Sequence, residues 1–205
     1  MVAASFVILG FSGLNLTFGA YVLRPVIGPD AFTAVTWWGQ AAHHYLSFPF
    51  VLGLLVMLAV RMRDNLPTKV DVAWIKAGGP MAKGHPPAGR FNAAQKALYW
   101  LVVGGGILAA LSGYLLMAPS LLDNVNSQQW AHMLHGAMTM VMIAAILGHI
   151  YIGTIGTEGA FGAMSTGQVD YNYAREHHNL WVDEKLAEAH RLARQGSVAR
   201  TSGAD

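Results

Sequence analysis

Two histidines in one apolar segment are the residues of this sequence best suited to chemistry. They are His135 and His149, fourteen residues apart in the run Leu134–Ile150. In an α-helix they would lie about 21 Å apart along the axis and about 40° apart around it, and so share a face. A helix needs about 20 apolar residues to cross a bilayer, so one histidine would lie near each surface. This arrangement suits two metal centres stacked across a membrane.

A partner for His135 occurs in another apolar run, where His43 follows Trp38 and Gly39. Both runs are expected to cross the membrane in the same direction, which puts His43 and His135 at similar depth near the outer surface. Imidazoles on both axial faces of an iron ion would form a low-spin b-type haem, held without covalent links. Adjacent helical residues point about 100° apart, so only one of His43 and His44 can face this haem.

His149 is expected to ligate a second haem iron near the inner surface. Its partner should lie at the inner start of the first apolar run, yet no histidine occurs between Met1 and Val26. We therefore expect the missing ligand just upstream of Met1, unless the second haem is lost or differently ligated.

Other residues around these histidines carry weaker signals. A lone membrane histidine can simply donate a hydrogen bond between helices, but the shared face and matched depths of the three histidines favour iron ligation. Gly39, about one turn before His43, is the best candidate for close contact with a macrocycle, and Arg24 could pair with a haem propionate. The remaining histidines fall in interfacial or polar segments and are expected near the surface: His85, His132, His177, His178 and His190.

Composition indicates a membrane protein built from helices. Of the 205 residues, 54% are hydrophobic and 12% are charged, against about 25% charged in soluble domains. The apolar residues form four runs long enough to span, at about 1–23, 38–60, 94–118 and 130–155. We predict an all-α, four-helix haem-binding transmembrane domain over 1–160 and a C-terminal tail over 161–205. No nucleic-acid partner is expected.

The sequence contains no cysteine. This excludes iron–sulfur clusters held by the chain itself, covalently attached c-type haem and disulfides. Nine histidines and ten methionines remain as possible metal ligands.

Lysine and arginine placement predicts the topology, because cytoplasmic loops carry an excess of both. The loop between the second and third runs is rich in them, with its flanks: Arg61, Arg63, Lys69, Lys76, Lys83, Arg90 and Lys96. The tail holds five more: Arg175, Lys185, Arg191, Arg194 and Arg200. We therefore expect both termini and the central loop to be cytoplasmic. The outer segment Pro25–Trp38 is predicted to be a short interfacial helix, and Trp181–Arg194 a cytoplasmic helix.

Several motifs resemble those of one respiratory family. They are Phe91-Asn-Ala-Ala-Gln-Lys96, Met133-Leu-His-Gly136, Gly148-His-Ile-Tyr151, the segment Gly156–Met164, and Ala174-Arg-Glu-His-His-Asn-Leu-Trp181. In combination they resemble formate dehydrogenase gamma subunits, the diheme cytochrome b556 membrane anchors of respiratory formate dehydrogenase. The resemblance extends from the first apolar run through Trp181.

The resemblance implies a position in an electron-transfer chain of the bacterial inner membrane. A gamma subunit takes electrons from an iron–sulfur beta subunit, whose molybdenum- or tungsten-containing alpha partner oxidises formate. The electrons pass from an outer haem to an inner haem and reduce menaquinone or ubiquinone near the cytoplasm. By motif, His43 and His135 match the outer ligands and His149 matches one inner ligand. The other inner ligand of the family lies in an Arg-x-x-His-Trp motif, and Met1–Phe6 resembles the segment directly after it.

A quinone site is expected beside the inner haem. Asn92 and Gln95 begin the third apolar run, where their amides could hydrogen-bond a quinone carbonyl or a bridging water. Helix capping explains the same two residues equally well, because Asn92 suits an N-cap and Gln95 would complete a capping box.

Two other functions fit the four-span pattern. One is the cytochrome b anchor of a nickel–iron hydrogenase. The segments Gly156–Gly159 and Arg175–His178 favour formate dehydrogenase over this alternative. The other is a haem-free structural anchor or transporter. A reduced-minus-oxidised spectrum separates the cytochromes from the haem-free protein, and neighbouring genes separate the two cytochromes.

Overall fold

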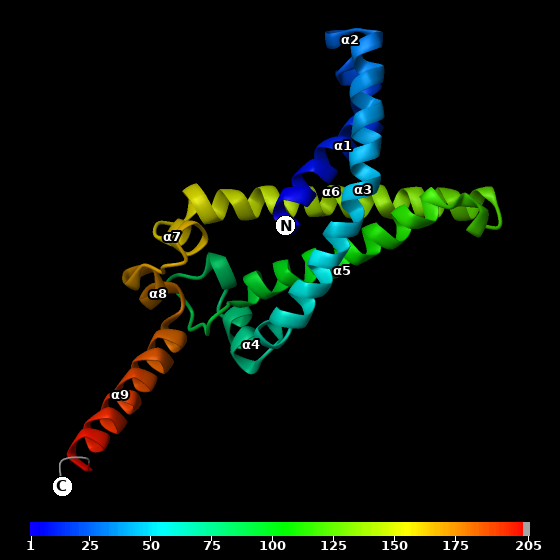
Figure 1. Cartoon of the computed structure of the whole chain (residues 1–205). Helices are drawn as coiled ribbons and strands as arrows, with labels where there is room; N and C mark the ends of the chain where they lie inside the picture. Colours follow the sequence, from blue (N-terminus) through cyan, green and yellow to red (C-terminus); the bar gives the residue numbers. More distant parts are fainter. Residues whose placement is uncertain (203–205) are drawn as a thin grey trace. The chain divides into compact units, whose positions relative to one another are not determined.

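The computed structural model describes residues 1–202, with side chains for residues 1–195. Every regular element in that range is helical (Figure 1). The longest helices are α1 (Val2–Val22), α3 (Pro29–Arg61), α5 (Ala93–Met117) and α6 (Val125–Tyr151), and a π-helical turn, η4 (Ile152–Gly156), continues α6. All four are long and apolar enough to cross a membrane. The predicted all-α fold with four spans is confirmed.

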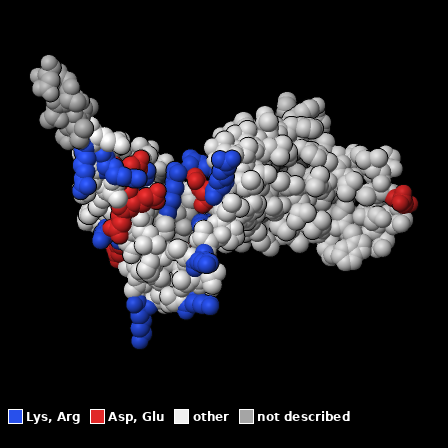
Figure 2. Space-filling view, turned by 90° about the horizontal axis from the view of Figure 1, so that it is seen from below, with Lys and Arg blue, Asp and Glu red and all other residues white. Residues whose placement is uncertain are grey.

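Large apolar side chains cover the outer surfaces of these four helices. Phe11, Trp38 and Leu147 are 72%, 68% and 63% exposed. A soluble protein rarely presents so extensive an apolar surface to water, whereas lipid tails solvate one well. Charged side chains cluster together in Figure 2, and broad stretches of the visible surface carry none. The chain is a multi-pass integral membrane protein.

The segment Pro25–Trp38 does not form the separate interfacial helix that was predicted. A single turn, α2 (Arg24–Ile27), ends at Gly28, whose φ of 81° favours glycine, and Pro29 then begins α3. Proline is pre-set for the first helical position, and the residues from there to Trp38 contain no further helix breaker. Helix α3 therefore takes up most of this segment and runs for 33 residues, about 50 Å.

Residues Met1–Arg63 and Trp100–Ile146 form one compact unit. Its core contains Phe50 and Leu54 of α3 and Met142 of α6, which are 6%, 0% and 2% exposed. Helices α1 and α5 add partly buried side chains to this core: Val2, Phe6, Leu9, Val102 and Ile107. All four long helices thus contribute to one apolar cluster.

Residues 64–99 and the chain from Leu147 onward form a second compact unit. Short elements make up most of it: α4 (Lys69–Lys76), η2 (Gly79–Met81), α7 (Ala160–Ser165) and α8 (Tyr171–His177), with η1 (Arg63–Asn65) at its start. The tail contains α9 (Asn179–Ser202), which confirms the helix predicted over Trp181–Arg194.

The connection between α5 and α6, in the first unit, contains one further turn, η3 (Pro119–Leu121).

Asp71 organises the first part of the second unit. Its carboxylate accepts hydrogen bonds from the N–H and the hydroxyl of Thr68 at 2.6 and 2.8 Å, and Lys96 Nζ donates to it at 2.8 Å. Burial raises the pKa of this carboxyl, but the bonds from Lys96 and Thr68 outweigh burial and hold the pKa of Asp71 below its ordinary value. The ionised carboxylate therefore ties α4 to the first turn of α5.

A set of hydrogen bonds, here called the clasp, joins Ala88 and Gly89 to the start of α9. The Ala88 N–H donates to Asn179 Oδ1 at 3.3 Å, the Leu180 N–H donates to the Ala88 carbonyl at 3.2 Å, and His178 Nδ1–H donates to the Gly89 carbonyl at 2.9 Å. The expected surface position of His178 was wrong, because the clasp buries its ring to 5% exposure. That burial lowers the pKa of His178, and the Gly89 carbonyl partly opposes the shift.

Candidate functional site

The structure brings together His43 of α3 and His135 of α6, both in the first unit. Their ring centroids lie 6.1 Å apart and their planes cross at 72°. Both residues are partly buried within the apolar helices. The two imidazoles predicted to share one iron are therefore neighbours.

A serine of α1 holds the ring of His43. Ser12, which is 7% exposed, has its Oγ 3.0 Å from His43 Nδ1 and 2.7 Å from the Ile8 carbonyl. A hydroxyl has one hydrogen and a carbonyl can only accept, so the Ser12 hydroxyl donates to Ile8 and accepts from His43 Nδ1–H. This places the proton of the neutral imidazole on Nδ1 and leaves the Nε2 lone pair available to a metal.

A matching arrangement on α5 holds the ring of His135. Its Nδ1 lies 2.8 Å from the Ala109 carbonyl and 3.4 Å from Ser112 Oγ. Because the carbonyl can only accept, Nδ1 must carry the proton here too. Ser112 is 3% exposed and donates to the Leu108 carbonyl at 2.8 Å. The contacts of His43 with Ser12, and of His135 with Ser112 and Ala109, all use Nδ1, so none of them occupies Nε2.

A glycine follows each of these serines and makes room for the ring. A Cβ on Gly13 would lie 3.2 Å from His43 Cε1, and one on Gly113 would lie 3.0 Å from His135 Cε1. The Ser-Gly pair therefore occurs twice, in α1 facing α3 and in α5 facing α6. Neither Ser12 nor Ser112 was predicted from the sequence as part of the site. The available signal was the recurrence of Ser-Gly in the two spans that carry no histidine of their own.

The donor set fits a haem held by two histidines. Two imidazoles bound to one metal through Nε2 at about 2 Å would have ring centroids about 6 Å apart, close to the observed 6.1 Å. Hydrogen bonds from the non-ligating nitrogen typically fix the tautomer and orientation of metal-bound histidines. Both features are present at His43 and His135.

Two other residues considered for the outer site, His44 and Gly39, have surroundings of their own. His44 lines a pocket of about 650 Å³ with Trp37, Trp38 and Tyr45. Gly39 faces α1, because a Cβ there would lie 3.7 Å from Asn15 Nδ2 and 3.9 Å from Ser12 Cβ, which are ordinary contact distances. Its contact with a haem stays a prediction.

The remaining predicted haem residues are exposed. Arg24 begins α2, and its side chain is open to the surroundings. His149 lies in the last turns of α6, in the second unit, and is also exposed. Their proposed contacts with haem therefore rest on the sequence pattern.

Asn92 and Gln95 form the capping box that their spacing predicted. The Asn92 N–H donates to Gln95 Oε1 at 2.9 Å, and the Gln95 N–H donates to Asn92 Oδ1 at 3.0 Å. Both side-chain oxygens thus stabilise the first turn of α5. Each amide keeps its NH₂ group, so a quinone carbonyl could be bound only through those donors.

Comparison with known proteins identifies relatives over most of the chain. A family model described as prokaryotic cytochrome b561 matches residues 1–167. The nitrate-inducible formate dehydrogenase cytochrome b556(Fdn) subunit of Escherichia coli K12 is 25% identical over 165 residues, which cover 77% of this chain and 76% of that protein. The formate dehydrogenase cytochrome b556(fdo) subunit of the same strain is 24% identical over 187 residues, covering 89% of this chain and 85% of that protein.

Proposed function

Because this chain belongs to the prokaryotic cytochrome b561 family, we propose that it is the haem b subunit that anchors a respiratory formate dehydrogenase to the bacterial inner membrane. In this role it receives electrons from an iron–sulfur beta subunit and passes them to menaquinone or ubiquinone. A molybdenum- or tungsten-containing alpha subunit oxidises formate. The relatives named as formate dehydrogenase subunits support this assignment.

The observation that carries the proposal is the His43–His135 pair. Both rings present an unprotonated Nε2, and both Nδ1 protons are committed to acceptors on a neighbouring helix. In this proposal the two Nε2 atoms hold one haem b, which when bound accepts and releases single electrons. The four apolar helices exclude water from the ligands, and Ser12 and Ser112 keep the rings in place.

A second haem b completes the proposed path. His149 is its proposed ligand on α6. The abundance of lysine and arginine in the second unit supports a cytoplasmic position for that unit and for both termini. Electrons would then cross the membrane from the outer pair toward Asn92 and Gln95.

Purification of the tagged chain from its native membranes tests the function. We expect a b-type α-band in the reduced-minus-oxidised spectrum, reduction of that band by formate, and co-purification of the iron–sulfur and molybdenum or tungsten subunits. A chain without the band would be a haem-free anchor. A band that dihydrogen reduces and formate does not would make the chain a hydrogenase anchor.

Replacing Ser12 by alanine should loosen the haem at the outer pair. The change removes the acceptor of His43 Nδ1–H. Loss of a residue that hydrogen-bonds a metal ligand typically weakens metal binding about 10- to 100-fold. We expect haem transfer to apomyoglobin to become faster to a comparable degree.

Thr17→Ala is the matched control for Ser12→Ala. Thr17 is a hydroxyl residue of the same helix, and within the described part of the chain its hydroxyl donates to the Gly13 carbonyl of its own helix. Equal haem transfer from the two variants would show that the Ser12 hydroxyl does not hold His43.

Asn92→Asp separates quinone binding from helix capping. Aspartate keeps an oxygen that can accept from Gln95 N–H, and it is as good an N-cap as asparagine, but it lacks the NH₂ donor. We expect the thermal unfolding midpoint to stay near wild type while reduction of the haem by a quinol analogue slows about tenfold, the value of one lost hydrogen bond to a neutral acceptor. Unchanged quinol kinetics would leave Asn92 with capping alone.

A further inference from the structure

Three potential metal ligands gather in the second unit, outside the candidate haem site. They are His85, Glu176 and His177, whose ligand atoms all lie within 4.8 Å of one another. His85 Nε2 is 2.5 Å from Glu176 Oε1, and the rings of His85 and His177 have centroids 4.4 Å apart. The proposed electron path uses none of them.

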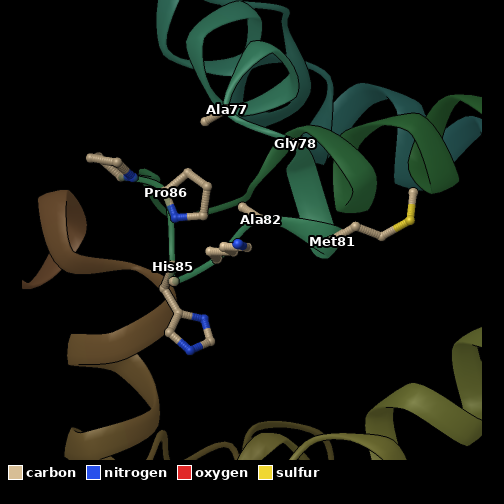
Figure 3. Close-up of a pocket in the computed structure, with 9 residues that line it drawn as sticks. Ala77, Gly78, Met81, Ala82, His85 and Pro86 are labelled. Carbon is tan, nitrogen blue, oxygen red and sulfur yellow. The ribbon is translucent and has the colours of Figure 1, made fainter.

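The clasp fixes the two segments that supply these ligands. His85 is separated from Ala88 only by Pro86 and Pro87, whose rings restrict the backbone. Glu176 and His177 immediately precede His178, which the clasp buries. In Figure 3 the ring of His85, which precedes Pro86 in the chain, lies beside the ribbon of the tail. The ligands are therefore brought together by backbone contacts that do not depend on a metal.

The donor set matches zinc. Two imidazoles and one carboxylate are a recognised ligand set for Zn²⁺, with the fourth position left to water. Bonds of about 2.0–2.2 Å in a tetrahedral site place ligand atoms about 3.3–3.5 Å apart. His85 and Glu176 must therefore separate by about 1 Å and give up their hydrogen bond. Side chains that are 43% and 54% exposed have room to do so.

We propose that His85, Glu176 and His177 bind a divalent transition-metal ion, with Zn²⁺ the best match. The ion would connect the loop before α5 to the end of α8, beside the clasp. This inference is independent of the proposed electron-transfer function, because it uses none of the haem or quinone residues.

Titration of the untagged, haem-loaded, full-length protein in detergent with Zn²⁺ tests the proposal by calorimetry. We expect one equivalent of Zn²⁺ to bind after treatment with a chelator. His85→Ala and His177→Ala should each weaken that binding at least about tenfold, since loss of a direct ligand costs no less than loss of an outer partner. In difference spectra, substitution with Co²⁺ should give the visible bands of a tetrahedral site in the wild type and neither in His85→Ala nor in His177→Ala.

His190→Ala is the matched control, because His190 is an exposed histidine of the same tail outside the cluster. It should bind Zn²⁺ as the wild type does. The proposal is overturned if the wild type binds no stoichiometric Zn²⁺, or if His190→Ala weakens binding as much as His85→Ala. Glu176→Gln keeps the side-chain shape and should also weaken binding, which guards against a loss caused by misfolding.

Discussion

Replacing His135 by alanine is expected to remove the outer haem b from the protein. The change takes away one of the two Nε2 atoms of the pair, together with the imidazole that lies against Gly113. Loss of a residue that only hydrogen-bonds a metal ligand costs about 10- to 100-fold in metal affinity. Loss of the ligand itself should therefore leave less than about one-tenth of that haem bound. The pyridine haemochrome assay measures haem per mole of purified protein.

His132→Ala is the control for this experiment. His132 lies on α6 about one turn before His135 and is exposed, so its loss should leave the haem content unchanged. The variants His43→Ala and His44→Ala allow the same comparison on α3. Of these two, His43→Ala should lose haem and His44→Ala should keep it. Wild-type haem in His135→Ala or His43→Ala would disprove the pairing.

Replacing Gly106 by alanine is expected to disrupt the packing of the first unit. A Cβ there would lie 2.6 Å from Leu54 Cδ1 and 3.4 Å from Phe50 Cζ. Leu54 has no exposed surface, so its side chain has nowhere to move, and overpacking of this kind typically costs about 1–3 kcal/mol. Thermal unfolding in detergent, followed by circular dichroism and by haem absorbance, should show a lower midpoint.

The run Gly104–Gly106 supplies its own control. A Cβ on Gly104 would meet no atom within 4 Å, and alanine is the better helix former by roughly 0.8–1.0 kcal/mol. Gly104→Ala should therefore match or exceed the stability of the wild type. If both variants unfolded at the same temperature, close approach at Gly106 would not explain the packing of α5.

The apolar runs in the sequence predicted the long helices of this protein, and the one misplaced helix start follows from the chemistry of a turn. A long apolar run specifies a membrane helix by itself, so all four spans were found. The start of α3 was misplaced because its position depends on Gly28 adopting a positive φ ahead of Pro29. Sequence alone presents these two residues only as a generic turn.

Contacts between distant residues explain what the sequence could not predict about the sites. Helix direction and depth sufficed to bring His43 and His135 together. The roles of the Ser12 and Ser112 hydroxyls could not be predicted, because a Ser-Gly pair is common in membrane helices and the histidine that each hydroxyl contacts belongs to another helix. In the same way, His178 was expected at the surface because its neighbours in the sequence are polar. Its hydrogen bond to the Gly89 carbonyl, 89 residues away in the chain, could not be predicted from those neighbours.

The neutral acceptors behind the two imidazoles have a consequence for reduction potential. A carboxylate at Nδ1–H raises the basicity of a ligating histidine and so stabilises ferric iron. Here the acceptors are a hydroxyl and a carbonyl, and the first unit contains only two carboxylates, Asp30 and Asp123. The positive charge of an oxidised haem would find little compensation in this surrounding, so gaining an electron is favoured. A haem held by this pair would therefore be biased toward its reduced state by the Ser12 hydroxyl and the Ala109 carbonyl, the same groups that orient the two rings.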